Sequence, residues 1–264
     1  MRTLPLVLLA LSLAACGAPE AANNVAGAEL ADPVPVPDYV TAALADPARA
    51  AHLAADARRH PGEIIAFSGL KPGDRVLDLI PGDGYWTRLF SRIVGPEGRV
   101  YAVWPRNYAV LSQGNVATLR QIAADPHYPN VTVEVQPTPL LTASEPLDMV
   151  FTSQNYHDYP DEFMGRTDPA QLNRAVFAML KPGGTWFIVD HAAAAGSGMR
   201  DTETMHRIDP AEVRRQVEAA GFEFVGESRV LANSADDHTL PVFNPAVRGR
   251  TDQFILRFRK PGGP

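Results

Sequence analysis

The chain has 264 residues, of which 45% are hydrophobic and 20% are charged, so it can bury a sizeable core. This composition excludes a chain that is disordered throughout. The formal net charge of −6 and the scattered Arg and Lys residues argue against nucleic acid as the main partner, because phosphate binding needs a basic surface. A single cysteine, Cys16, leaves no disulfide framework and no thiolate metal site.

The N-terminal segment has the pattern of an export signal. An apolar run from Leu4 to Leu13 follows Arg2; this length is typical of a signal-peptide core and too short to span a bilayer. The stretch Leu13-Ala14-Ala15-Cys16 resembles the bacterial lipoprotein signal. That resemblance implies a signal peptide of residues 1–15, lipidation of Cys16 and a periplasm-facing anchor in the cell envelope, with Gly17 favouring the outer membrane. The alternative is an ordinary secretory signal with a chance cysteine.

The next segment has the composition of a tether. Residues 16–37 are rich in Ala, Pro, Asn and Gly, which cannot bury enough surface to fold alone. Residues 38–264 are expected to form a single domain with an N-terminal helical extension. Tyr39 to Arg59 has helical spacing with Asp46-Pro47 as a predicted cap, and Pro61 to Phe67 predicts a further short helix.

The rest of the chain alternates short apolar runs with segments of helical length. The runs predict strands at Val76–Ile80, Val100–Trp104, Val131–Val135, Leu147–Thr152, Thr185–Asp190, Phe222–Val230 and Gln253–Phe258. The segments between them predict helices at Trp86–Ile93, Gly114–Ala123, Pro169–Leu180 and Pro210–Ala220. This alternation favours an α/β fold with a mostly parallel sheet and helices on both faces. The long polar connection of residues 232–250 indicates an antiparallel edge strand.

A glycine-rich turn follows the first predicted strand. Asp78, Gly82 and Gly84 give the spacing D-x-x-x-G-x-G at the end of the strand, where an open α/β sheet binds its ligand. The helix that begins near Tyr85 directs its positive end at this loop. A dinucleotide fingerprint needs a third glycine where this chain has Thr87, so NAD is disfavoured. The missing G-K-[ST] excludes a P-loop.

This loop resembles the first motif of class I S-adenosylmethionine-dependent methyltransferases. The stretches "PLDMVFTSQNYHDY", "MLKPGGTWFIVD" and "VRRQVEAAGFEF" are similar to later landmarks of that superfamily in the same order. In detail the chain looks like an uncharacterised group of exported bacterial predicted methyltransferases. The resemblance implies a Rossmann-like, seven-stranded methyltransferase fold that takes S-adenosylmethionine as cofactor and methylates a small or lipophilic acceptor. The sequence does not indicate an oligomeric state.

The resemblance also implies roles for the residues of the loop. Gly82, Asp83 and Gly84 would lie against the methionine end of the cofactor, and Asp78 would hold its ammonium group directly or through water. A carboxylate suits a ligand that carries an ammonium and a sulfonium. The alternative is a tight strand-to-helix turn without a ligand, in which Asp78 caps the amides of the turn.

The end of the second predicted strand departs from the superfamily. An acidic residue usually grips the ribose there, whereas this chain has Trp104, and an indole accepts no hydrogen bond. Trp104 would either stack on adenine, with Asn107 reaching the ribose, or fill a cavity that has lost its nucleoside.

Polar residues after the fourth and fifth strands are the acceptor-side candidates. His157 is a predicted catalytic base because a histidine pKa lies near neutrality, and Asn155 is predicted to position backbone or ligand. The alternative for His157 is a hydrogen bond to the backbone alone. Asp190-His191 with Asn155 resembles the cation site of the metal-assisted branch, but that branch uses two carboxylates and one is clear here. No metal site is therefore predicted.

Two functions from different classes remain open. The first is an envelope-anchored methyltransferase. In it, His206 and Arg207 would either form a lid over the site or make ion pairs on the surface beside the predicted helix cap Asp209-Pro210. The second is a non-catalytic lipoprotein that keeps the scaffold and binds another small ligand or a protein partner. Trp104 motivates the second, and a donor that is made in the cytoplasm is the main difficulty for the first.

Overall fold

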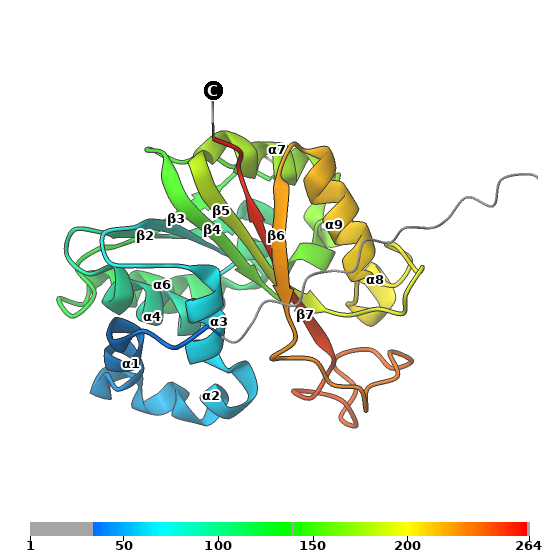
Figure 1. The fold of residues 1–264 in the computed structure, drawn as a ribbon, viewed down its shortest axis with the longest axis horizontal. Helices are drawn as coiled ribbons and strands as arrows, with labels where there is room; N and C mark the ends of the chain where they lie inside the picture. The colour runs from blue at the N-terminus through cyan, green and yellow to red at the C-terminus, as the bar shows by residue number, and fades with distance from the viewer. Residues whose placement is uncertain (1–33, 139, 263–264) are drawn as a thin grey trace, which may run out of the picture.

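The computed structural model describes residues 34–138 and 140–262, so the predicted signal peptide, Cys16 and most of the predicted tether lie outside the described residues. A seven-stranded sheet in the order β3-β2-β1-β4-β5-β7-β6 forms its centre (Figure 1). The strands are β1 (Arg75–Leu79), β2 (Arg99–Pro105), β3 (Val131–Gln136), β4 (Leu147–Ser153), β5 (Leu180–His191), β6 (Glu223–Ser228) and β7 (Gln253–Arg259). All seven predicted strands are confirmed, and β5 begins earlier than predicted.

The direction of the strands follows the sequence prediction. Strands β1 to β5 pair in parallel, and β7 pairs antiparallel with both β5 and β6. The predicted antiparallel pairing at the edge of the sheet is therefore confirmed. Strand β7 itself enters between β5 and β6, which leaves β6 as the edge strand.

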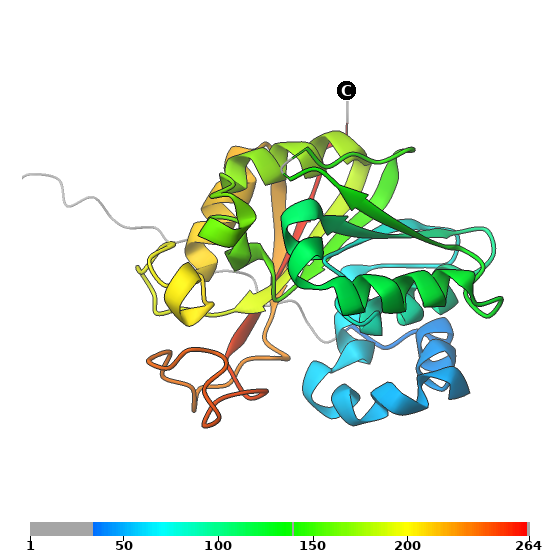
Figure 2. The same cartoon turned by 180° about the vertical axis from the view of Figure 1, so that it is seen from behind.

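Helices cover both faces of the sheet, as Figures 1 and 2 show. One face carries α4 (Tyr85–Val94) and α6 (Gln113–Ala124), and α1 (Asp38–Leu44) packs against both α4 and α3 (Pro61–Ser68). The other face carries α7 (Pro169–Met179) and α9 (Pro210–Ala219). The remaining helices are α2 (Leu53–Arg59), α5 (Arg106–Leu111) and α8 (Thr202–Met205), with 3-10 turns at Pro47–His52 (η1), Tyr156–Asp158 (η2) and Glu162–Met164 (η3).

Alternating strand residues supply a core on each face. In β2, Val100 and Ala102 join the core under α4, whereas Tyr101 and Val103 join the core under α7 and α9. Such alternation is the pattern that a strand covered on both faces produces.

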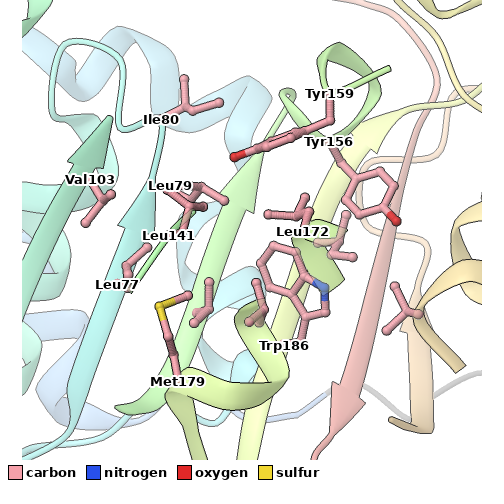
Figure 3. Packing of buried hydrophobic residues seen from close by; sticks show 14 of the residues in the cluster. Leu77, Leu79, Ile80, Val103, Leu141, Tyr156, Tyr159, Leu172, Met179 and Trp186 are labelled. Carbon is pink, nitrogen blue, oxygen red and sulfur yellow. The ribbon is translucent and has the colours of Figure 1, made fainter. Parts of the chain in front are cut away.

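A buried polar chain ties the second core to the turn η2. Trp186 donates to the Asn173 carbonyl oxygen at 3.1 Å, Asn173 donates to the Tyr156 hydroxyl at 2.8 Å, and Tyr156 donates to Gln216 at 2.9 Å. Figure 3 shows Tyr156 and Trp186 among the apolar residues of this core. Because each of these polar groups has a partner, the chain fixes η2, which carries His157.

Two predicted helix caps are confirmed. Asp46 accepts a hydrogen bond from the Ala48 amide at 2.9 Å, and Asp209 accepts one from the Ala211 amide at 2.9 Å. Between residues 34 and 262, as far as they are described, no helix combines the length and the apolar character needed to cross a membrane.

Candidate functional site

A cavity of about 450 Å³ lies beyond the carboxyl ends of β1, β2, β4 and β5. This is where an open α/β sheet places its ligand. The β1–α4 loop lines one end, which we call the donor end, and residues that follow β4 and β5 line the other, which we call the acceptor end. Of the predicted site residues, the cavity is lined by Asp78, Gly82, Asp83, Trp104, Asn155 and His157.

The backbone at the donor end adopts left-handed conformations. Ile80 has φ 57°, Gly82 has φ 60° and Gly84 has φ 86°. A left-handed β-branched residue is strained, and such strain is concentrated at functional sites. The Ile80 amide donates to the Val103 carbonyl at 2.9 Å, which holds this turn against β2.

The two glycines of the loop have different structural roles. A Cβ atom on Gly82 would meet open space, so this residue leaves bare backbone facing the cavity. A Cβ atom on Gly84 would lie 2.6 Å from Ile122 Cδ1, so Gly84 allows α4 and α6 to pack closely. Gly84 does not line the cavity, and its predicted contact with the cofactor stays a prediction.

Asp78 is the buried acid of the donor end. It is 1% exposed, and Thr87 donates a hydrogen bond to its carboxylate at 2.6 Å. At the position where a dinucleotide fingerprint has a glycine, this chain therefore has a threonine whose hydroxyl binds Asp78. Burial raises the pKa of Asp78 to about 7, against the opposing effects of Thr87 and the Arg59 charge.

Arg59 at the end of α2 brings a positive charge to this end of the cavity. Its guanidinium lies 4.7 Å from the centre of the Tyr85 ring, and it lines the cavity together with Asp83. Burial lowers the pKa of Arg59, but its ordinary value is so high that the side chain stays charged. The donor end therefore offers one carboxyl group, one guanidinium and bare backbone.

Trp104 is fully buried at the end of β2, with no surface exposed to solvent. Its ring packs 5.8 Å from Tyr108, and the cavity beside it stays open. Tyr108 and Leu111 of α5 form the neighbouring wall. Asn107 does not reach the cavity, because its amide donates to the Phe163 carbonyl at 3.3 Å; the predicted ribose contact of Asn107 is not supported. A role of Trp104 in adenine binding stays a prediction.

Asn155 bridges two strand ends, as a positioning role requires. Its amide donates to the carbonyl of Ile80 at 3.5 Å and also to the carbonyl of Ser153. The side chain therefore links the end of β4 to the strained turn after β1. A direct catalytic role for Asn155 stays a prediction.

His157 lies between two carboxylates at the acceptor end. Asp190 Oδ1 is 2.7 Å from His157 Nδ1, and Asp158 Oδ1 is 3.2 Å from Nε2. Burial lowers the pKa of His157, but the charges of Asp190 and Asp158 outweigh it and hold that pKa well above the usual value. With both ring nitrogens engaged, this arrangement does not favour His157 as a lone general base.

Two further histidines line the same end. His191 Nδ1 lies 2.8 Å from the Thr251 hydroxyl, and burial lowers the pKa of His191 to about 4. His206 has its ring 5.6 Å from that of His157 and lies 3.7 Å from Asp158 Oδ1. The sequence raised His206 only as part of a lid, and the structure places it inside the cavity wall.

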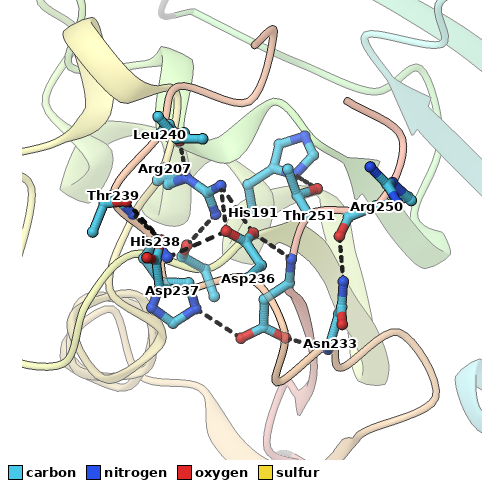
Figure 4. Close-up of polar contacts among 12 residues, drawn as sticks. His191, Arg207, Asn233, Asp236, Asp237, His238, Thr239, Leu240, Arg250 and Thr251 are labelled. Atoms are coloured by element: carbon cyan, nitrogen blue, oxygen red, sulfur yellow. Dashed lines mark hydrogen bonds and ion pairs between the residues drawn. The ribbon is translucent and has the colours of Figure 1, made fainter. Parts of the chain in front are cut away.

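Arg207 is not part of a lid. It is fully buried, pairs with Asp236 at 2.9 Å, and donates to the carbonyls of Ala192 and Leu240 at 2.9 and 3.0 Å (Figure 4). These bonds hold the segment of residues 229–252 beside β5. That segment supplies Val242 and Phe243 to the cavity wall.

Several lining residues had no clear signal in the sequence. Tyr108 and Leu111 lie on α5, a short helix that directly follows β2, and Phe243 lies in the long polar connection before β7. An aromatic residue three positions beyond the end of a strand is too common a pattern to indicate a site. His191 did have a signal, because the topology places Asp190-His191 at the end of β5 on the ligand side of the sheet.

The sheet order, the glycine turn after β1 and the cavity at the strand ends together define the class I methyltransferase fold. Among solved structures, the chain is similar to an S-adenosylmethionine-dependent methyltransferase from Aquifex aeolicus, with a TM-score of 0.53 and 19% identity over 84% of this chain and 96% of that one. At this identity the likeness shows the fold alone.

The curated relatives that the chain is similar to share one printed name. The chain is 34% identical over 128 residues to "Ubiquinone/menaquinone biosynthesis C-methyltransferase UbiE" of Vibrio campbellii, covering 48% of this chain and 44% of the relative. It is 30% identical over 172 residues to the protein of the same name in Vibrio cholerae, covering 62% and 60%. The chain thus spans about half the length of the curated relatives it matches. No protein-family model matches it.

Proposed function

We propose that this protein is an S-adenosylmethionine-dependent methyltransferase that acts on a small, lipophilic acceptor at the bacterial envelope. The observation that carries the proposal is one continuous cavity that joins the Asp78–Gly82 turn to the polar groups after β4 and β5. The names of the curated relatives, which are methyltransferases of quinone biosynthesis, support both the reaction and a quinone-type acceptor.

The donor end suits the charged groups of the methyl donor. Asp78, when ionised, would attract the ammonium and sulfonium charges, and Arg59 would attract the carboxylate. The bare backbone at Gly82 lets the methionine portion approach closely. Ser112 and Asn115 offer polar groups on the wall beyond Tyr108, where the ribose needs partners that Trp104 cannot provide.

The mouth of the cavity suits an apolar acceptor. Leu111 is 67% exposed and Phe243 is 61% exposed, and both line the cavity. Exposed apolar side chains around a concave site favour an apolar ligand. Phe163 and Val242 continue this apolar wall inward.

Methyl transfer needs alignment more than acid or base strength. The nucleophilic atom of the acceptor forms a bond to the methyl carbon as the bond from that carbon to sulfur breaks, and the demethylated thioether leaves. If the nucleophile carries a proton, the proton passes to a group on the acceptor wall or to water. The cavity contributes the fixed distance and direction between donor and acceptor.

Calorimetry and label transfer test the proposal. The full chain, purified in detergent, is expected to bind the methyl donor and its demethylated product, and to transfer labelled methyl to a short-chain naphthoquinol. Asp78→Asn keeps the shape and the Thr87 contact but removes the charge, so donor affinity should fall at least about tenfold at pH 8. Asp38→Asn, at an exposed position of α1, is the matched control.

Two results would count against the proposal. Absence of donor binding in a folded chain would leave the non-catalytic lipoprotein as the better account. Donor binding without transfer to any quinol would keep the cofactor and reject this acceptor class.

The envelope location rests on the lipoprotein-like stretch around Cys16. Metabolic labelling with a fatty acid should mark the wild-type chain and leave Cys16→Ala unmarked, because this is the chain's single cysteine. Fractionation of the two proteins then tests the anchor. Equal labelling of both would reject lipidation of Cys16.

A further inference from the structure

Three potential metal ligands meet at the acceptor end. His157 and Asp158 come from the turn η2, and His206 follows α8. Asp158 Oδ1 lies 3.2 Å from His157 Nε2 and 3.7 Å from His206 Nδ1, and the ligand atoms of the three residues all lie within 4.8 Å of one another. Two ligand atoms that each lie about 2.0–2.2 Å from one divalent ion are separated from one another by distances similar to the 3.2 and 3.7 Å seen here.

Asp190 orients His157 toward this point. Asp190 Oδ1 lies 2.7 Å from His157 Nδ1, and Asp190 Oδ2 accepts a hydrogen bond from the His157 amide at 2.8 Å. A carboxylate that holds the far nitrogen of a histidine is the usual support for a metal-binding imidazole. The nitrogen that remains, Nε2, is the one that faces Asp158.

The three ligands are partly enclosed and open on one side. His157 and Asp158 are buried, His206 is half-buried, and all three line the cavity. An ion held by three protein groups on one side keeps its other coordination positions open. Here those positions would face the space between the donor end and the apolar mouth.

The chemistry of the ligands selects a class of ion. Two imidazoles and one carboxylate suit a borderline ion such as Zn²⁺ or Fe²⁺, whereas Mg²⁺ and Ca²⁺ prefer oxygen ligands alone. The two carboxylates of Asp158 and Asp190 would balance the charge of a divalent ion in this buried place.

These ligands differ from the cation site considered from the sequence. Asn155 is engaged with backbone carbonyls, and the Asp190 oxygens accept from His157 and from the His191 amide at 2.8 Å. Both Asp190 oxygens are therefore engaged within the protein, whereas the bonds of Asn155 use only its amide nitrogen. Asp190 acts instead as the support of a ligand.

We propose that His157, Asp158 and His206 bind a divalent transition-metal ion on the acceptor side of the cavity. The ion would hold an oxygen of the acceptor at a fixed place beside the donor end. Binding of the ion does not depend on the proposed methyl transfer, so the two can be tested separately.

Metal titration of the full chain tests the site. The protein is purified in detergent, stripped with a chelator, and titrated with Zn²⁺ by calorimetry and with Co²⁺ by visible absorption. We expect one ion per chain and a cobalt spectrum with imidazole ligands. His206→Asn should weaken binding at least about tenfold, and Asp190→Asn should weaken it by about 10- to 100-fold through loss of support.

The variants are matched for backbone conformation. His206 and His60 both have left-handed φ, 53° and 43°, which Asn tolerates well, so neither change should disturb the fold. His60 lies outside the cavity, next to Glu63, and His60→Asn should bind Zn²⁺ as the wild type does. Circular dichroism and the melting temperature without metal check that each variant is folded.

Two outcomes would overturn the site. One is wild-type affinity that matches His206→Asn in folded protein, which would assign the ion to other surface histidines. The other is no saturable binding of either ion. Donor binding measured on the stripped protein reports on the proposed function separately, and its failure would leave the metal result intact.

Discussion

The donor end and the acceptor end of the cavity are built in different ways. One continuous stretch, residues 78–87, supplies the acid, the bare backbone and the hydroxyl of the donor end, and α2 adds Arg59. The acceptor end takes its groups from the turn η2, the end of β5, the residue after α8 and the segment of residues 229–252. When one stretch supplies most of a site, its residues form a motif with a fixed spacing that can be recognised in the sequence. When four separate segments supply a site, no such motif exists.

The largest effect is expected from removing the buried ion pair that supports the acceptor end. Asp236→Ala would leave the buried Arg207 guanidinium without its carboxylate, so the free energy of unfolding should fall by about 3 kcal/mol. Urea denaturation measures the change. The exposed neighbour offers a control, because Asp237→Ala should cost less than about 1 kcal/mol. Equal costs for the two variants would show that the buried pair does not anchor this segment.

A pair of glycine variants sharpens the comparison at the donor end. Gly84→Ala should lower the free energy of unfolding by about 2–3 kcal/mol, because the added Cβ meets Ile122 at a left-handed position. Gly82→Ala should cost only about 1 kcal/mol but should weaken donor binding, since its Cβ enters the cavity. Denaturation and calorimetry separate the two effects. The assignment fails if Gly84→Ala is the milder change for stability.

Donor affinity should depend on pH through Asp78. Because burial raises the pKa of Asp78 to about 7, the carboxyl is largely protonated at pH 6 and largely ionised at pH 8. The ionised form attracts the cationic donor, so affinity should rise about tenfold between these pH values. Asp78→Asn should lose this rise, and Asp38→Asn should retain it. A wild-type affinity that falls with pH would contradict the assignment.

The raised pKa of Asp78 also determines how the stability of the folded chain changes with pH. The folded chain holds the Asp78 proton more tightly than the unfolded chain, whose Asp pKa is near 3.8. The contribution of Asp78 to stability is therefore greatest below about pH 4 and declines as the pH rises toward about 7. Comparing wild type with Asp78→Asn across this range isolates the contribution.

The smallest expected effect lies at the mouth. Phe243→Ala should raise the KM for a naphthoquinol about fivefold, because the ring supplies apolar contact, and should leave donor binding unchanged. Its effect on stability should stay within about 0.5 kcal/mol, since the side chain is exposed. Val225→Ala, an exposed apolar residue of β6, is the control and should change neither quantity. A uniform loss of donor binding in Phe243→Ala would instead indicate a distorted cavity.

The fold was largely predictable because its strands carry clear apolar runs. The start of β5 was missed because Lys181-Pro182-Gly183-Gly184 has the composition of a loop, yet Gly183 and Gly184 bond with Lys260 beyond the end of β7. The helix α5 was missed because it begins directly after a strand and is short.

The site was predictable where it depends on one turn. Asp78 and Gly82 lie at the cavity as the spacing indicated, although their contacts with a cofactor stay proposals. The packing role of Gly84 depends on Ile122 of a distant helix, and the place of His206 depends on how α8 folds back. Such long-range contacts have no local pattern.

The buried Arg207–Asp236 pair has a consequence for selection by size. The residue before Arg207 is His206, and the Val242 amide donates to the Met205 carbonyl at 3.1 Å, so the segment at the mouth is fastened on both sides of that histidine. A bulky molecule could not widen the entrance without separating a buried charged pair. The entrance would therefore keep a fixed width, which would admit flat or slender molecules and exclude broad ones.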